Sequence, residues 1–295
     1  MADPISVVAL RGGVVESRHR VHAVAVRDGA VLEAAGDAQF VTFLRSAAKP
    51  LQALPLARAR PDLSSEEIAI ACATHLADAE QLAAVRRLLA RSGASEEDLA
   101  CGPEGKPPSR LNHNCSGKHA GMLLTCRESG WPTAGYTAPE HPLQQALLGE
   151  VAVAAQVAPE AVPTATDGCG VITWALALTS MAGAFARLRH RDGGEAVTAA
   201  MAAHPELIRS ERSPDTRLMR ALPGWVAKGG AEGVLCAAAP DGTAVALKVE
   251  DGADRAVGPA TARFLSRLGH ALEELAEVPI ENSRGERVGA LVTEP

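Results

Sequence analysis

Aromatic side chains are scarce in this sequence, which has 3% Phe, Trp and Tyr and a single tyrosine among 295 residues. A groove that stacks sugars or unpaired bases on aromatic rings is therefore not expected. The chain also lacks an excess of positive charge, because its formal net charge is −6 and its lysines and arginines are mostly dispersed. Without a basic face to neutralise phosphates, we do not expect nucleic-acid binding.

The sequence also lacks the marks of export. Its first stretch, MADPISVVALRGG, has no basic segment followed by a long apolar run, so we expect a cytoplasmic location. The chain has six cysteines, but their spacing shows no compact disulfide framework. In a reducing compartment they remain free thiols or metal ligands, and we expect no structural disulfide.

One long apolar stretch could in principle span a membrane. GCGVITWALALTSMAGAFA, residues 168–186, has 19 residues without a charge, and the basic run RLRHR follows it. However, threonine, serine and glycine dilute its hydrophobicity, and no second apolar span accompanies it. The stretch therefore predicts a buried helix over 171–187, and no membrane association is expected.

Apolar and polar residues alternate near both ends of the chain. HRVHAVAVRDGAVLEAAGD, residues 19–37, predicts a β-hairpin that turns at Asp28-Gly29, and GVLCAAAPDGTAVALKVEDG predicts another at Asp241-Gly242. RVGALV, residues 287–292, predicts a last strand. Helical signals predict helices at 78–91, 116–128, 142–154, 171–187 and 259–275.

Strands at both ends with helices between them predict an α+β fold, in which a mixed or antiparallel sheet from both chain ends accompanies a central helical region. We expect one catalytic unit over 1–295. It can be divided into a sheet lobe of about 1–45 and 225–295 and a helical lobe of about 46–224.

RSAAKP, residues 45–50, contains a Ser-x-x-Lys motif. Ser46 would lie at the mouth of a helix that holds Pro50 in its first turn, where backbone donors are free. A serine there can attack a carbonyl if Lys49, desolvated and neutral, takes its proton. The alternative is an N-terminal capping serine with a surface lysine, since the motif alone is common.

LNHNCSGKHAGML, residues 111–123, places Cys115 and Lys118 three residues apart at the start of a predicted helix. Residues i and i+3 share a helix face, so the thiol and the amine can converge on one polar site. The alternative is a buried thiol beside a solvated lysine.

Two further stretches carry candidate groups. CATH, residues 72–75, places the hydroxyl of Thr74 after an apolar run that begins with a Ser64-x-x-Glu67 capping signal. TDGCG, residues 166–170, offers an acid, a thiol and flexible glycines at a turn, where Asp167 and Cys169 can reach the edge of a site.

Taken together, these stretches resemble the Rhizobium etli-type L-asparaginases. The resemblance spans nearly the whole chain and rests on RSAAKPLQALPL, CATH, NHNCSGKHAGML, TDGCGV and AKGGAEGV with ALKVEDG, in the family's order and approximate spacing. It implies a serine-lysine amidohydrolase that acts on a small-molecule amide. It also implies a fold similar to serine β-lactamases and glutaminases, and a homodimer.

The resemblance also implies roles for individual residues. The catalytic positions match Ser46, Lys49, Thr74 and Lys248, and the positions that line the substrate pocket match Arg45, His119, Asp167 and Cys236. The family's zinc site matches Cys115, Lys118 and Cys169. A lysine must lose a proton before it can bind zinc. Cys236, which matches a family cysteine close to the zinc, has the alternative of a buried strand thiol.

One catalytic position departs from the family. Thr74 stands where the family has a serine, and it adds a methyl group and a restricted χ1 to the hydroxyl. The following LADAE also differs from the family's Ser-Gly-Glu run.

We expect hydrolysis of L-asparagine to L-aspartate and ammonia through an acyl-enzyme on Ser46, with zinc in a modulatory role. The alternatives are another serine acyl-transfer hydrolase, of the glutaminase or β-lactamase type, and a catalytically impaired metabolite-binding homologue.

Overall fold

The computed structural model describes residues 2–294, which divide into two compact units. Of the described residues, unit 1 comprises 2–42, 176–186 and 212–294, and unit 2 comprises 43–175 and 187–211. The chain passes between them four times: within β4 (Val41–Phe43), within β6 (Ile172–Ala177), within α7 (Leu178–Leu188) and between residues 211 and 212.

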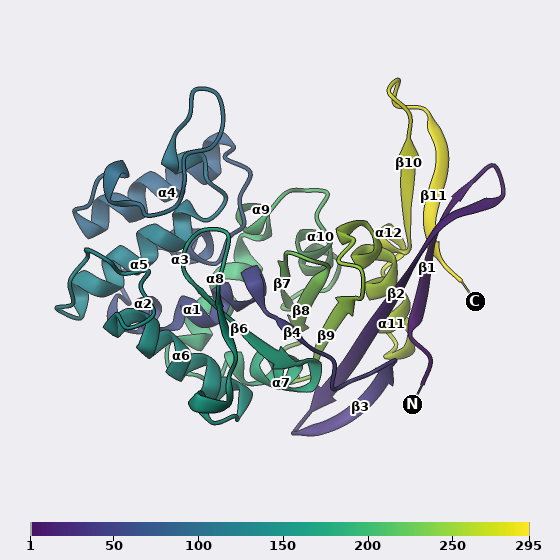
Figure 1. Cartoon of the computed structure of the whole chain (residues 1–295), viewed down its shortest axis with the longest axis horizontal. Coiled ribbons are helices and arrows are strands. Elements are labelled where there is room, and N and C mark those ends of the chain that lie inside the picture. Colours follow the sequence, from purple (N-terminus) through teal and green to yellow (C-terminus); the bar gives the residue numbers. More distant parts are fainter. Residues whose placement is uncertain (1, 295) are drawn as a thin grey trace. The chain divides into compact units, whose positions relative to one another are not determined.

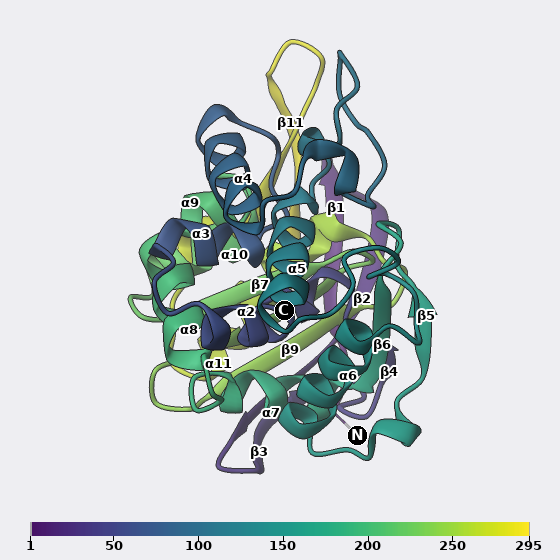
Figure 2. The ribbon, with the colours of Figure 1, turned by 90° about the vertical axis from the view of Figure 1, so that its left-hand side faces the viewer.

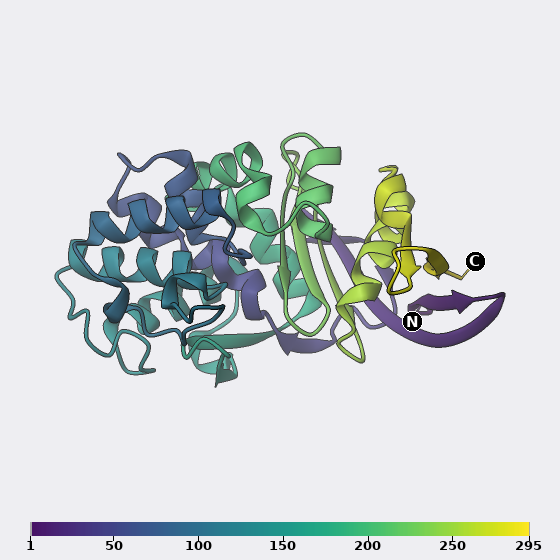
Figure 3. The same ribbon diagram turned by 90° about the horizontal axis from the view of Figure 1, so that it is seen from above.

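Unit 1 is built on an antiparallel sheet with the strand order β10-β11-β1-β2-β9-β8-β7, and β3 also pairs with β2. The first and last strands of the chain are thus neighbours in one sheet, as the purple and yellow strands of Figures 1 and 3 show. The strands are β1 (Ile5–Arg11), β2 (Val14–Arg27), β3 (Ala30–Ala35), β7 (Val226–Gly230), β8 (Val234–Ala238), β9 (Ala244–Val249), β10 (Glu277–Glu281) and β11 (Arg287–Thr293).

Local sequence explains the two expected hairpins. Asp28 and Gly29 both have positive φ, 51° and 80°, as the turn between β2 and β3 requires. The β8–β9 turn closes where the Asp241 carboxylate accepts the N–H of Thr243. The green strands β7, β8 and β9 lie side by side in Figure 2.

Helices cover part of this sheet. α11 (Val257–Arg267) packs against β1, β9, β10 and β11, α10 (Pro214–Ala221) packs against β7, and α12 (Glu273–Ala276) follows α11. The prediction of one helix over 259–275 is wrong at its end. Gly269 has a φ of +87° and the His270 N–H bonds to the Leu265 carbonyl, which terminates the helix.

Unit 2 is mainly helical, and α4 and α5 pack side by side in Figures 1 and 2. The expected capping box is present, because Ser64 and Glu67 each bond the other's backbone N–H. The helices are α1 (Lys49–Gln52), α2 (Leu54–Ala59), α3 (Ser65–Ala71), α4 (Ala79–Ser92), α5 (Ser116–Glu128), α6 (Pro142–Ala155), α8 (Gly194–Ala203) and α9 (Pro205–Ile208). Its one complete strand is β5 (Thr164–Thr166), which pairs with β6.

The predicted helix over 171–187 is wrong in its first part. Residues Ile172–Ala177 form strand β6, and only Leu178–Leu188 is helical. The β-branched and aromatic Ile172, Thr173 and Trp174 favour a strand, and pairing with β5 satisfies their backbone groups. Over residues 2–294 there is no helix of the length and apolar character that crossing a membrane demands.

Candidate active site

Most predicted site residues belong to unit 2. Ser46 and Lys49 lie where a 3-10 helix (Arg45–Ala48) runs into α1, with Pro50 in the first turn of α1 as expected. Ser46 is thus inside a helical turn and does not cap one. Lys49 is 1% exposed, which rules out a surface lysine.

Arg45 directly before the serine has a positive φ of 50°, which is uncommon for a non-glycine residue and raises its backbone energy. The Thr173 hydroxyl accepts its N–H at 3.1 Å, and the Trp174 carbonyl accepts the N–H of Leu44 at 2.9 Å. Strand β6 therefore holds the backbone that presents Ser46.

The amine of Lys49 donates to the Thr74 hydroxyl at 3.0 Å and to the Ala73 carbonyl at 2.5 Å. The Asn114 carbonyl lies at the limit of hydrogen-bond distance, 3.5 Å away. Burial lowers the pKa of Lys49, although the neighbouring Cys115 thiolate opposes this effect. Within residues 2–294, neither Lys49 nor any other residue hydrogen-bonds to the Ser46 hydroxyl.

A cluster of two thiols and an amine lies at the start of α5, comprising Cys115, Lys118 and Cys169. Lys118 is 3% exposed, so it is not the solvated lysine of the simpler interpretation, and its amine contacts the Cys169 sulfur at 2.9 Å. Cys115 contacts Cys169 as well. All six cysteines are free, as expected.

The charges of this cluster compensate one another. A hydrogen bond from Cys169, together with the nearby lysine charges, holds the pKa of the Cys115 thiol well below its ordinary value. Burial disfavours the charged form of Lys118, but attraction to Cys115 and Cys169 outweighs it and raises the lysine's pKa. The hydrogen bond to Cys115 and burial raise the pKa of Cys169. These pKa directions favour a negative charge on Cys115 and a positive charge on Lys118, which attract each other.

The same three groups fit zinc by their chemistry, because two thiols and an amine are donors that zinc accepts and Cys169 contacts both of the others. No group of three or more His, Cys, Asp and Glu residues within 2–294 could hold a metal. A site here therefore needs Lys118 as its third protein ligand, and zinc must displace the lysine proton.

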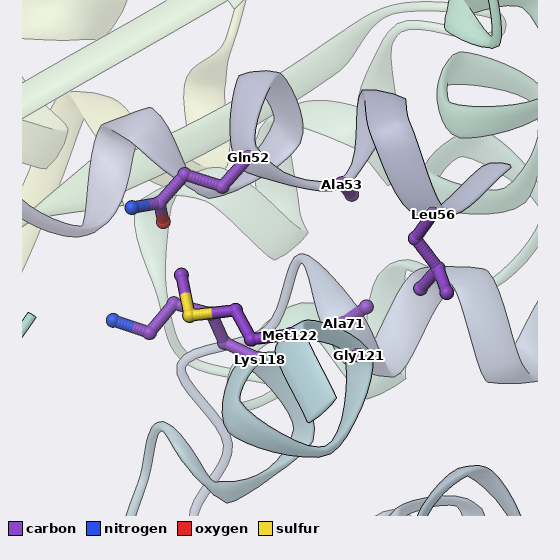
Figure 4. Close-up of a pocket in the computed structure, with 7 residues that line it drawn as sticks. All are labelled: Gln52, Ala53, Leu56, Ala71, Lys118, Gly121 and Met122. Carbon is purple, nitrogen blue, oxygen red and sulfur yellow. The ribbon is translucent and has the colours of Figure 1, made fainter. Parts of the chain in front are cut away.

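Lys118 also lines a small cavity with room for about one water, at about 10 Å³. Figure 4 shows the amine of Lys118 and the amide of Gln52 projecting to the same side, with the Met122 side chain beside them. Apolar groups line the rest, namely Ala53, Leu56, Ala71 and Gly121.

Arg45 and Asp167 form an ion pair at 2.6 Å between Nε and Oδ1. The same Oδ1 accepts the Gly168 N–H at 2.8 Å. Both hydrogen bonds of the Asp167 carboxylate therefore use one of its two oxygens, and Arg45 contributes only its Nε. Both side chains are partly exposed, at 27% and 11%. The pair thus presents a cation and an anion side by side.

His119 is fully buried. Its Nδ1 contacts the Tyr136 hydroxyl at 2.6 Å, and that oxygen accepts the Ala100 N–H. The Tyr136 hydroxyl therefore fixes the orientation of the His119 ring through Nδ1. The His119 Nε2 has no partner among the residues described, and burial lowers the pKa of this ring well below its ordinary value.

Lys248 and Cys236 belong to unit 1. Lys248, on β9, donates to the carbonyls of Glu232 at 2.6 Å and Val249 at 2.5 Å, and burial lowers its pKa. Cys236 is buried on β8, and burial raises its pKa to about 12, as for an inert strand thiol.

Three histidine and tyrosine contacts escaped the sequence analysis. His113 Nδ1 accepts the Cys115 N–H at 3.0 Å, His75 Nε2 contacts Ser116 at 2.8 Å, and Tyr136 orients His119. His113 could have been found from the sequence, because it lies two residues before Cys115. Tyr136 had none, because its partner lies 17 residues away in the chain.

These groups are the parts of a hydrolase that acts through an acyl-enzyme: a buried lysine beside a hydroxyl, a serine one turn before that lysine, and an Arg–Asp ion pair. The family model of L-asparaginase II matches residues 7–293, so the chain belongs to that family. No match was found among curated proteins. Membership supports an L-asparaginase-type amidohydrolase activity.

Proposed function

We propose that this chain hydrolyses the side-chain amide of L-asparagine with Ser46 as the nucleophile and Lys49 as its base. The observation that carries the proposal is the buried Lys49 amine, which bonds the Thr74 hydroxyl at 3.0 Å. Burial lowers the pKa of this amine and so favours the neutral form that a base requires.

In the first half-reaction, the Ser46 oxygen bonds to the carboxamide carbon while its proton passes to Lys49. The C–N bond then breaks as Lys49 returns that proton to the leaving nitrogen, which departs as ammonia. Water attacks the resulting ester, which releases aspartate and restores the serine. Ser46 and Lys49 are one turn apart, and the hydrogen bond between a nucleophile and its base often forms or shortens only when substrate binds.

Thr74 and Lys248 have supporting roles in this proposal. The Thr74 hydroxyl holds the Lys49 amine in place and relays protons during hydrolysis of the ester. We include Lys248 on the resemblance alone, as a second catalytic lysine that assists hydrolysis of the ester.

The Arg45–Asp167 pair favours an amino-acid substrate. The guanidinium retains terminal N–H groups for an α-carboxylate, and the free Asp167 oxygen can accept an α-ammonium. A zwitterion would thus have each charge met by an opposite one. We assign His119 and Cys236 to the substrate pocket on the resemblance alone.

Cys115, Lys118 and Cys169 would hold zinc in this proposal. Bound zinc would supply a Lewis acid and a template that orients substrate. The three residues, by holding that site beside Lys49, would affect substrate binding more than the proton transfers that Ser46 and Lys49 perform.

The test is ammonia release from L-asparagine, with L-aspartate identified by NMR. L-Glutamine and a chromogenic β-lactam are offered in parallel, because the alternatives are a glutaminase-type or β-lactamase-type hydrolase. Turnover of asparagine that is lost in Ser46→Ala and kept in Ser266→Ala, an exposed serine, supports the proposal. Binding of asparagine without turnover would instead identify an impaired metabolite-binding homologue.

The resemblance also leads us to propose a homodimer. Sedimentation equilibrium of the purified chain would show twice the mass of 30.5 kDa. A single 30.5 kDa species at micromolar concentration would contradict it.

A further inference from the structure

The segment that carries Thr74 is held by hydrogen bonds at almost every backbone N–H. Thr74 donates to the Ile208 carbonyl at 2.8 Å, and His75 donates to the Asn114 carbonyl at 3.2 Å. The Gln81 side chain accepts the N–H of Leu76 at 2.8 Å. The backbone at Thr74 is therefore fixed by its neighbours and not by Lys49 alone.

His75 contributes a second kind of contact through its ring, which is fully buried. Nδ1 accepts the Ala77 N–H at 3.1 Å, and Nε2 lies 2.8 Å from the Ser116 hydroxyl. Ser116 donates its own proton to the Leu111 carbonyl at 2.8 Å, so the serine oxygen accepts from His75. Both ring nitrogens are thus used, one as acceptor and one as donor.

The two contacts join different parts of unit 2. Ala77 has a positive φ of 61°, and the bond to Nδ1 stabilises this unfavourable turn just after Thr74. Ser116 is the first residue of α5 and follows Cys115. The imidazole therefore fixes the distance between the Thr74 segment and the start of the helix that carries Lys118.

This distance matters because a threonine cannot compensate for backbone movement. Its χ1 is restricted by the methyl group, so the direction of the Thr74 hydroxyl follows its backbone. The Lys49 amine belongs to another element, α1, although the Ala73 carbonyl of the Thr74 segment also accepts from it. A small displacement of the Thr74 segment would break the contact between the hydroxyl and the amine.

We propose that His75 is a positioning residue for amide hydrolysis, which holds the Thr74 hydroxyl against Lys49 by bridging Ala77 to Ser116. This inference rests on the function proposed above. It assigns His75 no contact with substrate and no proton transfer.

The variants separate the two ends of the bridge. His75→Asn keeps an acceptor for the Ala77 N–H, as in an Asx turn, but is too short for Ser116. His75→Gln restores an N–H donor with longer reach. Ser116→Ala removes the acceptor and leaves the histidine intact. Ser92→Ala is the matched control, because this buried hydroxyl also donates to a backbone carbonyl, that of Leu89.

We measure kcat and KM for asparagine in each variant, with and without Thr74→Ala. His75→Asn and Ser116→Ala are expected to lower kcat about tenfold with little change in KM, since misplacement of a catalytic group by even a fraction of an ångström is costly. His75→Gln recovers part of the loss, and Ser92→Ala is unaffected. In the Thr74→Ala background, His75→Asn has no further effect, because no hydroxyl remains to be positioned.

A fall in kcat that is equal in both backgrounds would show a merely structural histidine and overturn the inference, as would an unchanged kcat in both single variants. Circular dichroism checks that each variant folds. If His75→Asn does not fold, the kcat of Ser116→Ala tests the inference in its place. A wild-type chain that is inactive on asparagine overturns the proposed function and this inference together. An active wild type with insensitive variants overturns this inference alone.

Discussion

The amine of Lys49 and the hydroxyl of Thr74 are hydrogen-bonded across 3.0 Å, although the two residues are 25 positions apart in the chain. The resemblance gives Thr74 and Lys248 as two of the four catalytic positions. In the structure the partner of Thr74 within its own unit is Lys49, the base proposed for Ser46. The threonine thereby gains a direct connection to the first step of the reaction.

Removing the nucleophile or its base should abolish turnover. Ser46→Ala is expected to lower kcat about a thousandfold or more, and Lys49→Met nearly as much, because an unassisted serine is a weak nucleophile. The assay is ammonia release with the fold checked by circular dichroism. Folded Ser46→Ala protein with near-normal activity would transfer the nucleophile's role to another group, with Thr74 the first candidate.

Thr74 can be tested by keeping or removing its hydroxyl. Thr74→Ser should keep kcat within about threefold or raise it, since the hydroxyl remains and gains rotational freedom. Thr74→Val, which has nearly the same shape, should lower kcat about a hundredfold because the hydrogen bond to Lys49 is lost. A severe loss in Thr74→Ser would mean that the site depends on the methyl group.

Asp167→Asn tests the recognition of the α-ammonium group. KM for asparagine should rise about tenfold or more, since the variant no longer offers a charged acceptor. Succinamate, which lacks the α-amino group, serves as the matched substrate, and its KM should change much less. Equal effects on the two substrates would assign Asp167 to holding Arg45 and not to the ammonium.

Zinc binding is tested by elemental analysis. We expect about one zinc per chain, lost in the Cys115→Ser/Cys169→Ser double variant and kept in Cys126→Ala, a buried thiol elsewhere on α5. Removal of zinc should raise KM more than it lowers kcat. Protein that carries no zinc and takes up none when it is added would contradict zinc binding by these three residues.

His75 also makes the stability of the fold depend on pH. Burial lowers its pKa from 6.5 to about 4, so the unfolded chain binds the proton more tightly. The contribution of neutral His75 to the free energy of unfolding is fully present above pH 6.5 and is lost as the pH falls to 4. The maximum loss is on the order of 3 kcal/mol. Urea unfolding of wild type and His75→Gln measures it. The gap between their stabilities should narrow on acidification, and a constant gap would contradict this prediction.

Much of the local structure was predictable because neighbouring residues decide it. The Asp28-Gly29 turn, the Ser64/Glu67 capping box and the helix over 116–128 each depend on groups a few positions apart. The joining of both chain ends in one antiparallel sheet also agreed with the alternating patterns.

Where sequence reasoning failed, distant contacts outweighed local signals. Residues 172–177 carry an apolar pattern compatible with a buried helix, but their pairing with Thr164–Thr166 makes them a strand. The helix predicted over 259–275 ended early for a local reason instead, because Gly269 adopts the left-handed conformation that terminates a helix.

The sequence by itself determined which groups this chain can use: a serine, a lysine three residues on, a thiol and amine at a helix start, and an acid between glycines. Only the tertiary structure decided that Lys118 is buried against Cys169, that Arg45 pairs with Asp167 and that Lys49 bonds Thr74. Side-chain identity sets the possible chemistry, whereas burial and long-range packing set the distances and proton affinities on which that chemistry depends.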